Sequence, residues 1–259
     1  MKLKISLVFC LALGISACSS GGDSAQKEYM DSKEVDKIIN GIVRSSAELP
    51  QYVKIYTQYG EDEYGGCTGT AIGDKQILTA AHSVYNARAI VVEIGDDETA
   101  GTVAVERYHT GAGYDGTTPQ DDIALLVLQN SAGLPVLPLT EQGFENGEPA
   151  MIAGFGLEDG VNGSFGVRRS GTVYIQDTTQ DHFVAQYDGA QSNPCFGDSG
   201  GPLIKMLTDV EGNVTGTALA GLVSFGTHEA CGMGDTTYYT KVTNFLDSLL
   251  ALSPGTPVI

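Results

Sequence analysis

The sequence contains no tryptophan and only 14 basic residues, against 32 acidic residues, in a chain of 259. The formal charge of −18 argues against binding to nucleic acid or to an anionic membrane surface, because both are themselves negatively charged. No block of like charges is long enough to indicate a disordered interaction tail. We therefore expect no nucleic-acid partner, and we interpret the charge as one that keeps an exported protein soluble.

Helical periodicity is also scarce. Apolar residues recur at helical spacing only near the C-terminus, at Val242, Phe245, Leu246, Leu249 and Leu250. Elsewhere 34 glycines separate short runs of β-branched residues, which is typical of strands joined by turns. The sequence predicts an all-β fold with a C-terminal α-helix. Strands are expected at 52–59, 71–81, 89–95, 102–108, 122–128, 150–155, 166–176, 183–187, 201–206 and 217–225.

Long hydrophobic runs are absent beyond the N-terminus. Lys2 and Lys4 precede an apolar core, Ile5–Ile15, that is too short to span a bilayer, so residues 1–18 are predicted to be a signal peptide. The segment Ile15–Cys18 resembles the bacterial lipoprotein cleavage box, in which the cysteine is acylated; the alternative is a plain secretory signal with Cys18 incidental. We expect an exported protein, lipid-anchored at the bacterial cell envelope, released to the periplasm or extracellular space, or both.

Residues 19–37 are polar and rich in small residues, so they are predicted to be a linker or propeptide before a domain that spans 38–259. The most informative stretch of that domain is Cys195–Pro202, which contains the segment Gly-Asp-Ser-Gly-Gly-Pro. A serine hydroxyl needs a base to become nucleophilic, and the oxyanion that it generates needs backbone N–H donors. Glycines on both sides of Ser199 let the chain turn so that two amides can point at one position.

This stretch resembles the active-serine motif of the trypsin/chymotrypsin-like serine proteases, and the resemblance extends over about 38–252. It implies two six-stranded antiparallel Greek-key β-barrels that meet at about 130–150. Pro135–Leu139 is similar to the connector between the barrels. Gly154–Gly156 is similar to the segment that opens the second barrel, with phenylalanine in place of tryptophan.

The same resemblance implies a histidine and an aspartate upstream of Ser199, in that order. His82 follows Thr79-Ala80-Ala81, and Asp122 precedes Ile-Ala-Leu-Leu, so both lie in matching contexts. His82 is then the general base, and Asp122 orients its imidazole. The N–H groups of Gly197 and Ser199 are the implied oxyanion hole. Asp121 is expected to point to the opposite face and stay in contact with water.

Lys37-Ile38 is similar to the activation site of the family, where cleavage frees an amine that pairs with the aspartate before the nucleophile, here Asp198. Asn40 stands where glycine is usual. The alternative is a first strand that merely follows a lysine. We prefer the activation site, because a buried carboxylate at Asp198 needs a cationic partner.

The resemblance also pairs Cys195 with Cys231 in a disulfide. The family's partner for Cys67 is replaced by Ser83, so Cys67 is predicted to be unpaired; it is either buried and inert or reactive, and we prefer buried. Some relatives bind calcium near the acidic turn 96–98. That turn is shorter than their loops, and we expect a solvated turn with no metal and no cofactor.

The implied specificity pocket has Asn193 at its floor and Ser224 and Gly226 in its walls, with Thr237 narrowing its base. A neutral floor lacks the charge that selects lysine or arginine, so a medium-sized uncharged side chain is expected. In the alternative, Glu229 or Asp235 supplies a carboxylate from the flanking loop.

The sequence thus predicts a serine endopeptidase that forms an acyl-enzyme. Its expected partners are protein or peptide substrates, an activating protease that cuts after Lys37, and a membrane reached through lipid on Cys18 before activation. The alternative is a surface lipoprotein that keeps the fold as a dormant binding module. Mass analysis of the mature N-terminus separates the two.

Overall fold

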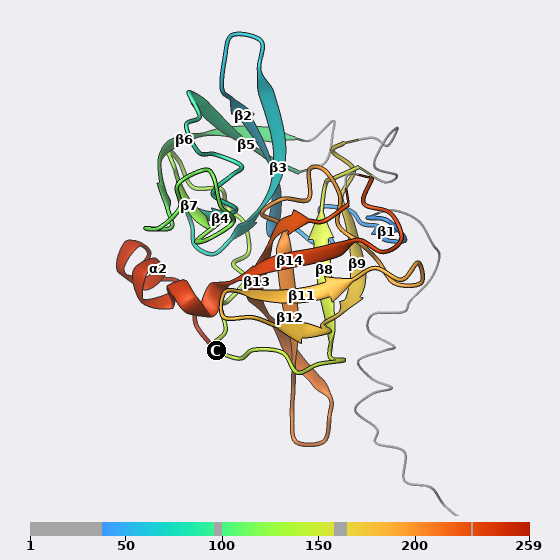
Figure 1. The fold of residues 1–259 in the computed structure, drawn as a ribbon. Coiled ribbons are helices and arrows are strands. Elements are labelled where there is room, and N and C mark those ends of the chain that lie inside the picture. Colours follow the sequence, from blue (N-terminus) through green and yellow to red (C-terminus); the bar gives the residue numbers. More distant parts are fainter. Residues whose placement is uncertain (1–37, 96–99, 158–164, 229) are drawn as a thin grey trace, which may run out of the picture.

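The structure is a computed structural model that describes residues 38–95, 100–157, 165–228 and 230–259 (Figure 1). The predicted signal peptide with Cys18, the predicted linker with Lys37, the acidic turn at 96–98 and Glu229 lie outside the described residues. Across the described ranges, no helix is both long enough and apolar enough to cross a membrane.

Fourteen strands and one short helical segment make up the described chain. The strands are β1 (Ile42–Val43), β2 (Tyr52–Gln58), β3 (Tyr64–Ala71), β4 (Gln76–Thr79), β5 (Ala89–Ile94), β6 (Gly101–Thr110), β7 (Ala124–Leu128), β8 (Pro149–Gly154), β9 (Arg169–Tyr174), β10 (Asp177–Thr178), β11 (His182–Gln186), β12 (Pro202–Thr208), β13 (Val214–Gly226) and β14 (Thr236–Lys241). The 3-10 helix η2 (Val242–Phe245) continues directly into the α-helix α2 (Leu246–Leu252). This helix is the one predicted from the C-terminal periodicity.

Strands β2 to β7 form a closed antiparallel barrel in the order β2-β3-β4-β7-β6-β5. Its interior is filled by alternating apolar side chains such as Val53 and Ile55 of β2, Ile77 of β4 and Leu126 and Leu128 of β7. Each of these five residues is 0% exposed. Burial of one such side chain contributes roughly 1.5–3 kcal/mol, so this interior fixes the strand register against slippage.

The remaining strands form an eight-stranded antiparallel sheet in the order β1-β9-β8-β12-β13-β14-β11-β10. The prediction of an all-β fold with two sheets and a C-terminal helix is confirmed. The second sheet differs in detail from the expected six-stranded barrel, because the two-residue strands β1 and β10 extend its edges. Its hydrogen-bonded ladder stays open across the described residues.

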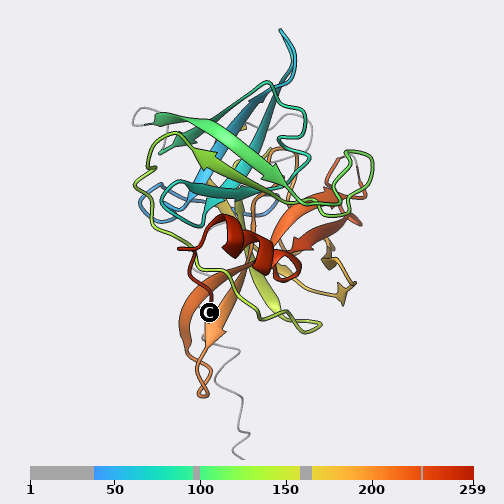
Figure 2. The same ribbon diagram turned by 90° about the vertical axis from the view of Figure 1, so that its left-hand side faces the viewer.

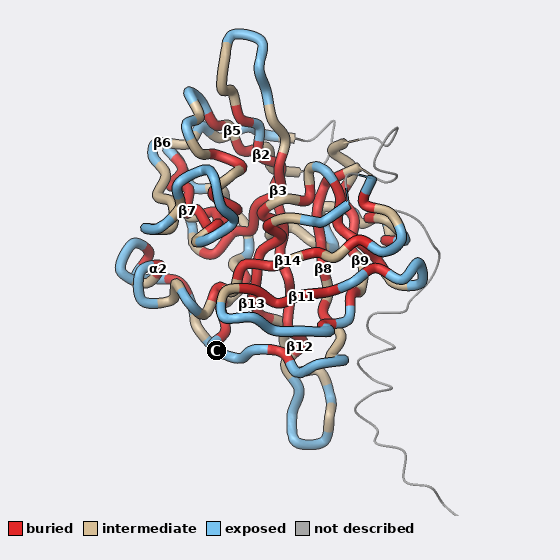
Figure 3. Tube along the Cα trace, in the orientation of Figure 1, coloured by how far each residue is buried: buried red, intermediate tan, exposed pale blue. Residues whose placement is uncertain are grey.

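A third apolar cluster joins the two sheets and the C-terminal helix. Leu78 and Leu125 of the barrel pack with Ile204 and Leu222 of the second sheet and with Leu249 of α2. Figures 1 and 2 show α2 beside the junction of the two sheets. Figure 3 shows the buried residues concentrated along the strands, while the hairpin tips are exposed. The junction is therefore a packed core that holds the two sheets in one relative position.

Strand β3 was not predicted, and the stretch 71–81 was expected as one strand. In the structure β3 ends at Ala71, and β4 begins at Gln76 after a turn. Three of the eight residues of β3 are glycines, which weaken a strand pattern in the sequence. At Gly69 a Cβ atom would lie 2.6 Å from the Cγ2 of Ile77, so close packing inside the barrel requires glycine there.

Candidate active site

His82 lies just after β4, at the end of the buried pair Ala80-Ala81. Its backbone N–H donates to Oδ1 of Asp122 at 2.8 Å, and its ring Nδ1 donates to Oδ2 of the same carboxylate at 2.8 Å. One carboxylate therefore holds both the main chain and the ring of His82. With Nδ1 carrying the proton, the neutral imidazole keeps Nε2 as its proton acceptor.

Asp122 is 2% exposed and lies immediately before the buried strand β7. Its Oδ2 also accepts a hydrogen bond from the Ser224 hydroxyl at 2.5 Å. Burial by itself raises the pKa of Asp122, but the hydrogen bond and the charge of His82, together with Ser224, outweigh burial and hold the pKa below its ordinary value. The buried group is thus an ionised acceptor that fixes the tautomer of His82.

Two neighbours of this pair make contacts that the sequence did not predict. Ser224 lines the active-site cavity, as predicted for the pocket wall, and its hydroxyl also donates to Asp122; the register of β13 and β14 shifts between Val223 and Phe225, and this bulge aims Ser224 at Asp122. Asp121 was expected simply to face water. It is only partly exposed and accepts a hydrogen bond from the N–H of Gly113 at 2.8 Å, which closes a neighbouring turn.

Ser199 lies in the turn before β12, where backbone contacts tie it to both sheets. Its carbonyl accepts from the N–H of Thr68 at 3.0 Å, and the N–H of Gly200 donates to the carbonyl of Val223 at 2.8 Å. Gly200 has φ +74°, and a Cβ atom there would lie 2.0 Å from Oγ1 of Thr79. Glycine is therefore required at position 200, because the backbone has a positive φ and because a side chain would collide with Thr79.

The peptide group before Gly197 is oriented by a specific contact. The carbonyl of Phe196 accepts from the N–H of Leu157 at 2.8 Å. Because C=O and N–H point in opposite directions across a trans peptide, the N–H of Gly197 faces away from Leu157. In the described part of the chain no backbone or side-chain acceptor takes up the N–H groups of Gly197 and Ser199. Both are thus available to bind an oxyanion.

A cavity of about 730 Å³ brings together the predicted catalytic residues and the predicted pocket residues other than Asn193. Its lining includes His82, Asp122, Gly197, Ser199, Ser224, Gly226 and Thr237. No hydrogen bond joins the Ser199 hydroxyl to His82 across the described residues, although both line this one space. In enzymes without bound substrate, the hydrogen bond between the nucleophile and its base often has a long donor–acceptor distance, which shortens when substrate binds. Across the same residues, no group of three His, Cys, Asp or Glu side chains could hold a metal ion.

Asp198 lies behind the cavity and is 1% exposed. Its carboxylate accepts from the N–H of Gly156 at 2.8 Å and from the N–H of Cys195 at 2.9 Å. Burial raises the pKa of Asp198 to about 6. At Gly156 a Cβ atom would lie 2.5 Å from this carboxylate, which explains the Gly-Phe-Gly segment as space made for Asp198.

The segment that begins at Ile38 is already inserted into the second sheet. Ile38 is 1% exposed and packs in the core of the second sheet. The main chains of Ile39 and Asn193 exchange two hydrogen bonds of 3.1 Å. The side-chain amide of Asn40 donates to the Tyr187 hydroxyl at 2.9 Å and to the carbonyls of Gly189 and Gln191 at 3.2 and 3.0 Å. The sequence identified Asn40 only as a departure from glycine and did not reveal these contacts.

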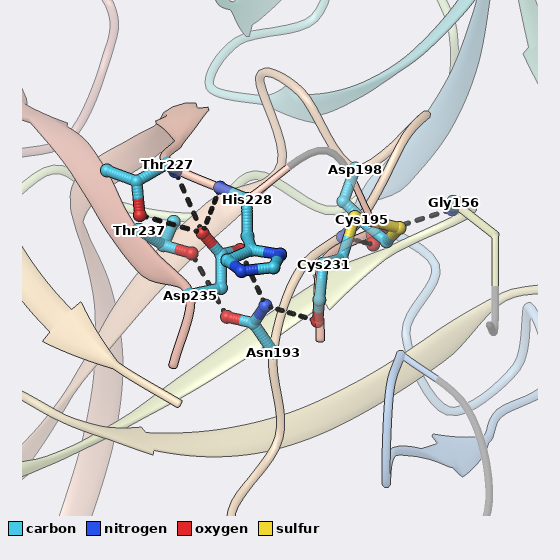
Figure 4. The surroundings of a disulfide bond; sticks show 9 residues. All are labelled: Gly156, Asn193, Cys195, Asp198, Thr227, His228, Cys231, Asp235 and Thr237. Atoms are coloured by element: carbon cyan, nitrogen blue, oxygen red, sulfur yellow. Dashed lines mark hydrogen bonds between the residues drawn. A yellow bond between two sulfur atoms is a disulfide. The ribbon is translucent and has the colours of Figure 1, made fainter. Parts of the chain in front are cut away.

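The predicted cysteine assignments are confirmed. Cys195 and Cys231 form a disulfide with a Cα–Cα distance of 5.5 Å (Figure 4). Cys67 is buried and is the free cysteine of the described ranges. It contacts the hydroxyl of Ser83, and burial raises the pKa of its thiol to about 12. The thiol is thus protonated at neutral pH and unreactive as a nucleophile.

Asn193, the predicted floor residue, does not line the cavity, and the base carries the carboxyl group of Asp235 where a neutral floor was expected. Asp235 lines the cavity and is 2% exposed, with its carboxylate against the Asn193 side chain (Figure 4). Thr237 also lines the base and donates to Asn193, so the predicted narrowing residue is in place. Of the two acids that the sequence offered as a substitute anion, Asp235 reaches the pocket and Glu229 lies outside the described residues.

Comparisons with known proteins give one consistent result. A family model described as Trypsin matches residues 38–249. A collagenase of Hypoderma lineatum is 27% identical over 276 residues, covering 95% of this chain and 96% of the relative. A chymotrypsin of Phaedon cochleariae is 25% identical over 280 residues, covering 95% and 97%. The solved structure of HL collagenase superposes with a TM-score of 0.67 and 24% identity, covering 83% of this chain and 98% of that one.

Proposed function

Because this chain belongs to the trypsin family of serine endopeptidases, we propose that it hydrolyses peptide bonds with Ser199 as nucleophile, His82 as general base and Asp122 as the group that orients His82. The observation that carries the proposal is the Asp122 carboxylate. It holds His82 through two contacts of 2.8 Å at a cavity that Ser199 also lines. This arrangement supports nucleophilic catalysis without a metal or an organic cofactor.

The proposed reaction has two halves. Ser199 Oγ attacks the carbonyl carbon of the substrate, and its proton passes to Nε2 of His82. The N–H groups of Gly197 and Ser199 bind the oxyanion of the tetrahedral intermediate. His82 then returns the proton to the departing amine, which leaves an acyl group on Ser199. Water repeats the sequence in the second half, releasing the acid and the free hydroxyl.

Asp122 remains ionised throughout this cycle and stabilises the imidazolium that forms on His82. Its lowered pKa supports this role, because a carboxylate that stays charged offers the imidazolium a fixed counter-ion. Each oxyanion donor contributes a factor of roughly 10²–10³ to turnover in enzymes of this mechanism. The Leu157–Phe196 contact, which orients the Gly197 N–H, supports a hole that is formed before substrate arrives.

We also propose that the protein is made as a zymogen and is activated by a second protease that cuts between Lys37 and Ile38. The new ammonium group of Ile38 then pairs with Asp198. Two observations support this: Ile38 is already 1% exposed beside the second-sheet core, and Asp198 is a buried carboxylate whose pKa burial raises to about 6. A neighbouring ammonium stabilises the ionised form of such a group.

Export and lipid attachment at Cys18 belong to the same proposal. They are supported by the basic residues Lys2 and Lys4 at the N-terminus, by the short apolar core that follows them and by the Ile15–Cys18 segment.

The nucleophile assignment is tested by Ser199→Ala. We expect this variant to lose covalent labelling by a fluorophosphonate probe and to turn over peptide substrates slower by orders of magnitude, with its far-ultraviolet circular dichroism unchanged. Ser248→Ala, which removes an exposed hydroxyl on α2, is the matched control and keeps full labelling. Labelling that survives in Ser199→Ala contradicts the assignment. An activated wild-type protein that neither labels nor cleaves indicates the dormant binding module instead.

A further inference from the structure

Around Asp235, the described side chains of Asn193 and Thr237 have no free hydrogen-bond donor. Both hydrogens of the Asn193 amide are used, one by Oδ2 of Asp235 at 2.9 Å and one by the carbonyl of Cys231 at 3.0 Å. Oδ1 of Asn193 accepts from the Thr237 hydroxyl at 3.0 Å, which uses the only proton of that hydroxyl. Figure 4 shows this arrangement, with Asp235 between Asn193 and the segment Thr227-His228.

The carboxylate of Asp235 is held by neutral donors. Oδ1 accepts from the N–H of Thr227 at 2.8 Å, from its hydroxyl at 3.2 Å and from the N–H of His228 at 2.9 Å. Among the described residues, Oδ2 accepts only from Asn193, so one of its lone pairs is open. No lysine or arginine of the described ranges forms an ion pair with Asp235. A buried carboxylate without a cation has a strong preference for acquiring one.

This carboxylate is placed where a substrate side chain would end. Asp235 and Thr237 both line the cavity, as does Gly226 in its wall. A Cβ atom at Gly226 would lie 2.9 Å from Oδ2 of Asp235, so glycine at this position is what leaves room for the carboxylate. The cation that Asp235 lacks can thus arrive with the substrate.

We propose that this cavity selects a lysine side chain on the acyl side of the cleaved bond, and that Asp235 is the residue that selects it. The proposal rests on the proposed endopeptidase function and names its substrate class. Two acceptors of the cavity lining lie at this point: the open lone pair of Asp235 Oδ2 and the lone pairs of Thr237 Oγ1. A lysine ammonium carries three N–H donors on one compact centre, so it can donate to both of them.

The same geometry disfavours arginine. A guanidinium binds a carboxylate best through two parallel hydrogen bonds, one to each oxygen. Oδ1 of Asp235 already accepts three hydrogen bonds from the loop, so only Oδ2 is available. Thr237 also narrows the base of the cavity. This narrowing excludes the planar guanidinium of arginine more than the smaller ammonium of lysine.

An uncharged side chain of the same length leaves both acceptors unpaired. Norleucine is the closest probe, because it replaces the lysine ammonium with a methyl group. Loss of hydrogen bonds to a charged group reduces binding in the transition state by roughly ten- to a hundredfold. Norleucine therefore separates the contribution of the charge from that of side-chain volume.

The first experiment uses the activated wild-type enzyme and matched peptides that differ only in lysine, arginine or norleucine before the scissile bond. We expect kcat/KM for lysine to exceed that for norleucine by roughly ten- to a hundredfold and also to exceed that for arginine. Equal values for lysine and norleucine overturn the proposal, and a preference for arginine overturns the selection of lysine. If no peptide is cleaved and the fluorophosphonate probe does not label Ser199, the proposed function itself fails.

The second experiment compares Asp235→Asn with Asp188→Asn. Both remove one negative charge, but Asp188 is exposed on the neighbouring loop, outside the cavity lining. The lysine-to-norleucine ratio should fall by about tenfold or more in Asp235→Asn and stay at the wild-type value in Asp188→Asn. A similar fall in both variants would attribute the preference to the net charge of the protein and overturn the role of Asp235. If Asp235→Asn does not fold, the lysine-to-norleucine ratio of kcat/KM in the wild-type enzyme tests the proposal by itself.

Discussion

Asp198 is a carboxylate whose protonation affects the stability of the whole chain. Its pKa in the folded protein is about 6, above the ordinary 3.8, because burial penalises the charged form. The folded state therefore binds this proton more tightly than the unfolded state. The resulting stability is fully present below pH 4 and is lost as the pH rises towards 6. In the cleaved chain, the ammonium of Ile38 would remove this penalty.

The uncleaved chain should accordingly become less stable between pH 4 and pH 6. With Ser199→Ala to prevent self-cleavage, we expect a loss of about 3 kcal/mol in the free energy of unfolding from Asp198 alone. The double variant Ser199→Ala, Asp198→Asn lacks the titration of Asp198. Its pH dependence therefore measures the contribution of all other ionisable groups. Urea unfolding at a series of pH values measures the difference. Parallel curves for the two proteins would show that Asp198 does not titrate in this range.

Single residues differ in how well the sequence predicted them. His82, Asp122 and Ser199 each stand in a short local motif, and the fold brings all three to one cavity. Asp235 was offered only as an alternative, and the sequence did not reveal that the hydroxyl of Ser224 donates to Asp122. Their contacts depend on a loop conformation and on a β-bulge, and neither leaves a pattern in the sequence.

Among the elements, the segment 38–41 has the clearest link to the pocket. It pairs with Asn193 through the main chain of Ile39 and is fastened to the loop 187–191 by the side chain of Asn40. Asn40 has φ +58°, a left-handed conformation that asparagine tolerates and that glycine adopts without strain. Glycine at this position would thus keep the turn but lose the side-chain contacts.

Replacing Asn40 with glycine should loosen that loop. We expect the free energy of unfolding to fall by about 2 kcal/mol, because the amide contacts are lost, and KM for peptides to rise more than kcat falls. Tyr187→Phe removes only one acceptor and should have about half the effect on stability. Thermal unfolding and steady-state kinetics on the activated enzyme check both. If Asn40→Gly matches the wild type in stability and KM, the contacts have no role in shaping the pocket.

Strands were predicted where valine and isoleucine recur, whereas the glycine-rich strand β3 and the threonine- and tyrosine-rich strand β14 were missed. The boundaries of β2 and β5 were correct to within one residue, since valine and isoleucine mark them. The glycines of β3 serve close approach: a Cβ atom at Gly66 would lie 2.5 Å from the ring of Phe165, which is remote in sequence. A single sequence contains no signal for such a contact.

In the molecule as a whole, the proposed catalytic groups are divided between the two sheets. His82 and Asp122 come from the barrel, whereas Ser199 and Ser224 come from the second sheet. The shared cluster around Leu222 and α2 fixes the distance between these halves. The local motifs predicted the two halves, but not the eight-stranded count of the second, because β1 and β10 have only two residues each.

Activation is also expected to change where the protein is. No cysteine lies between Cys18 and Lys37, and the disulfide of the described ranges joins Cys195 to Cys231, both beyond the cut. Cleavage after Lys37 therefore leaves no covalent link between a lipid on Cys18 and the protease. We expect chains that begin at Ile38 in the soluble fraction and Lys37→Gln chains in the detergent fraction. Active enzyme that begins at Ile38 yet stays with the membrane would contradict this.

Asn193 takes part in two of the contacts described above. Its main chain pairs with Ile39, and its side chain is bonded to Asp235 and Thr237 at the base of the cavity. We therefore predict that occupancy of the cavity and docking of the N-terminal segment are coupled, and such coupling is reciprocal. A lysine-like ligand would favour the docked segment, and the docked segment would bind that ligand more tightly. A substrate with a lysine side chain would thus favour the activation of the enzyme that cleaves it.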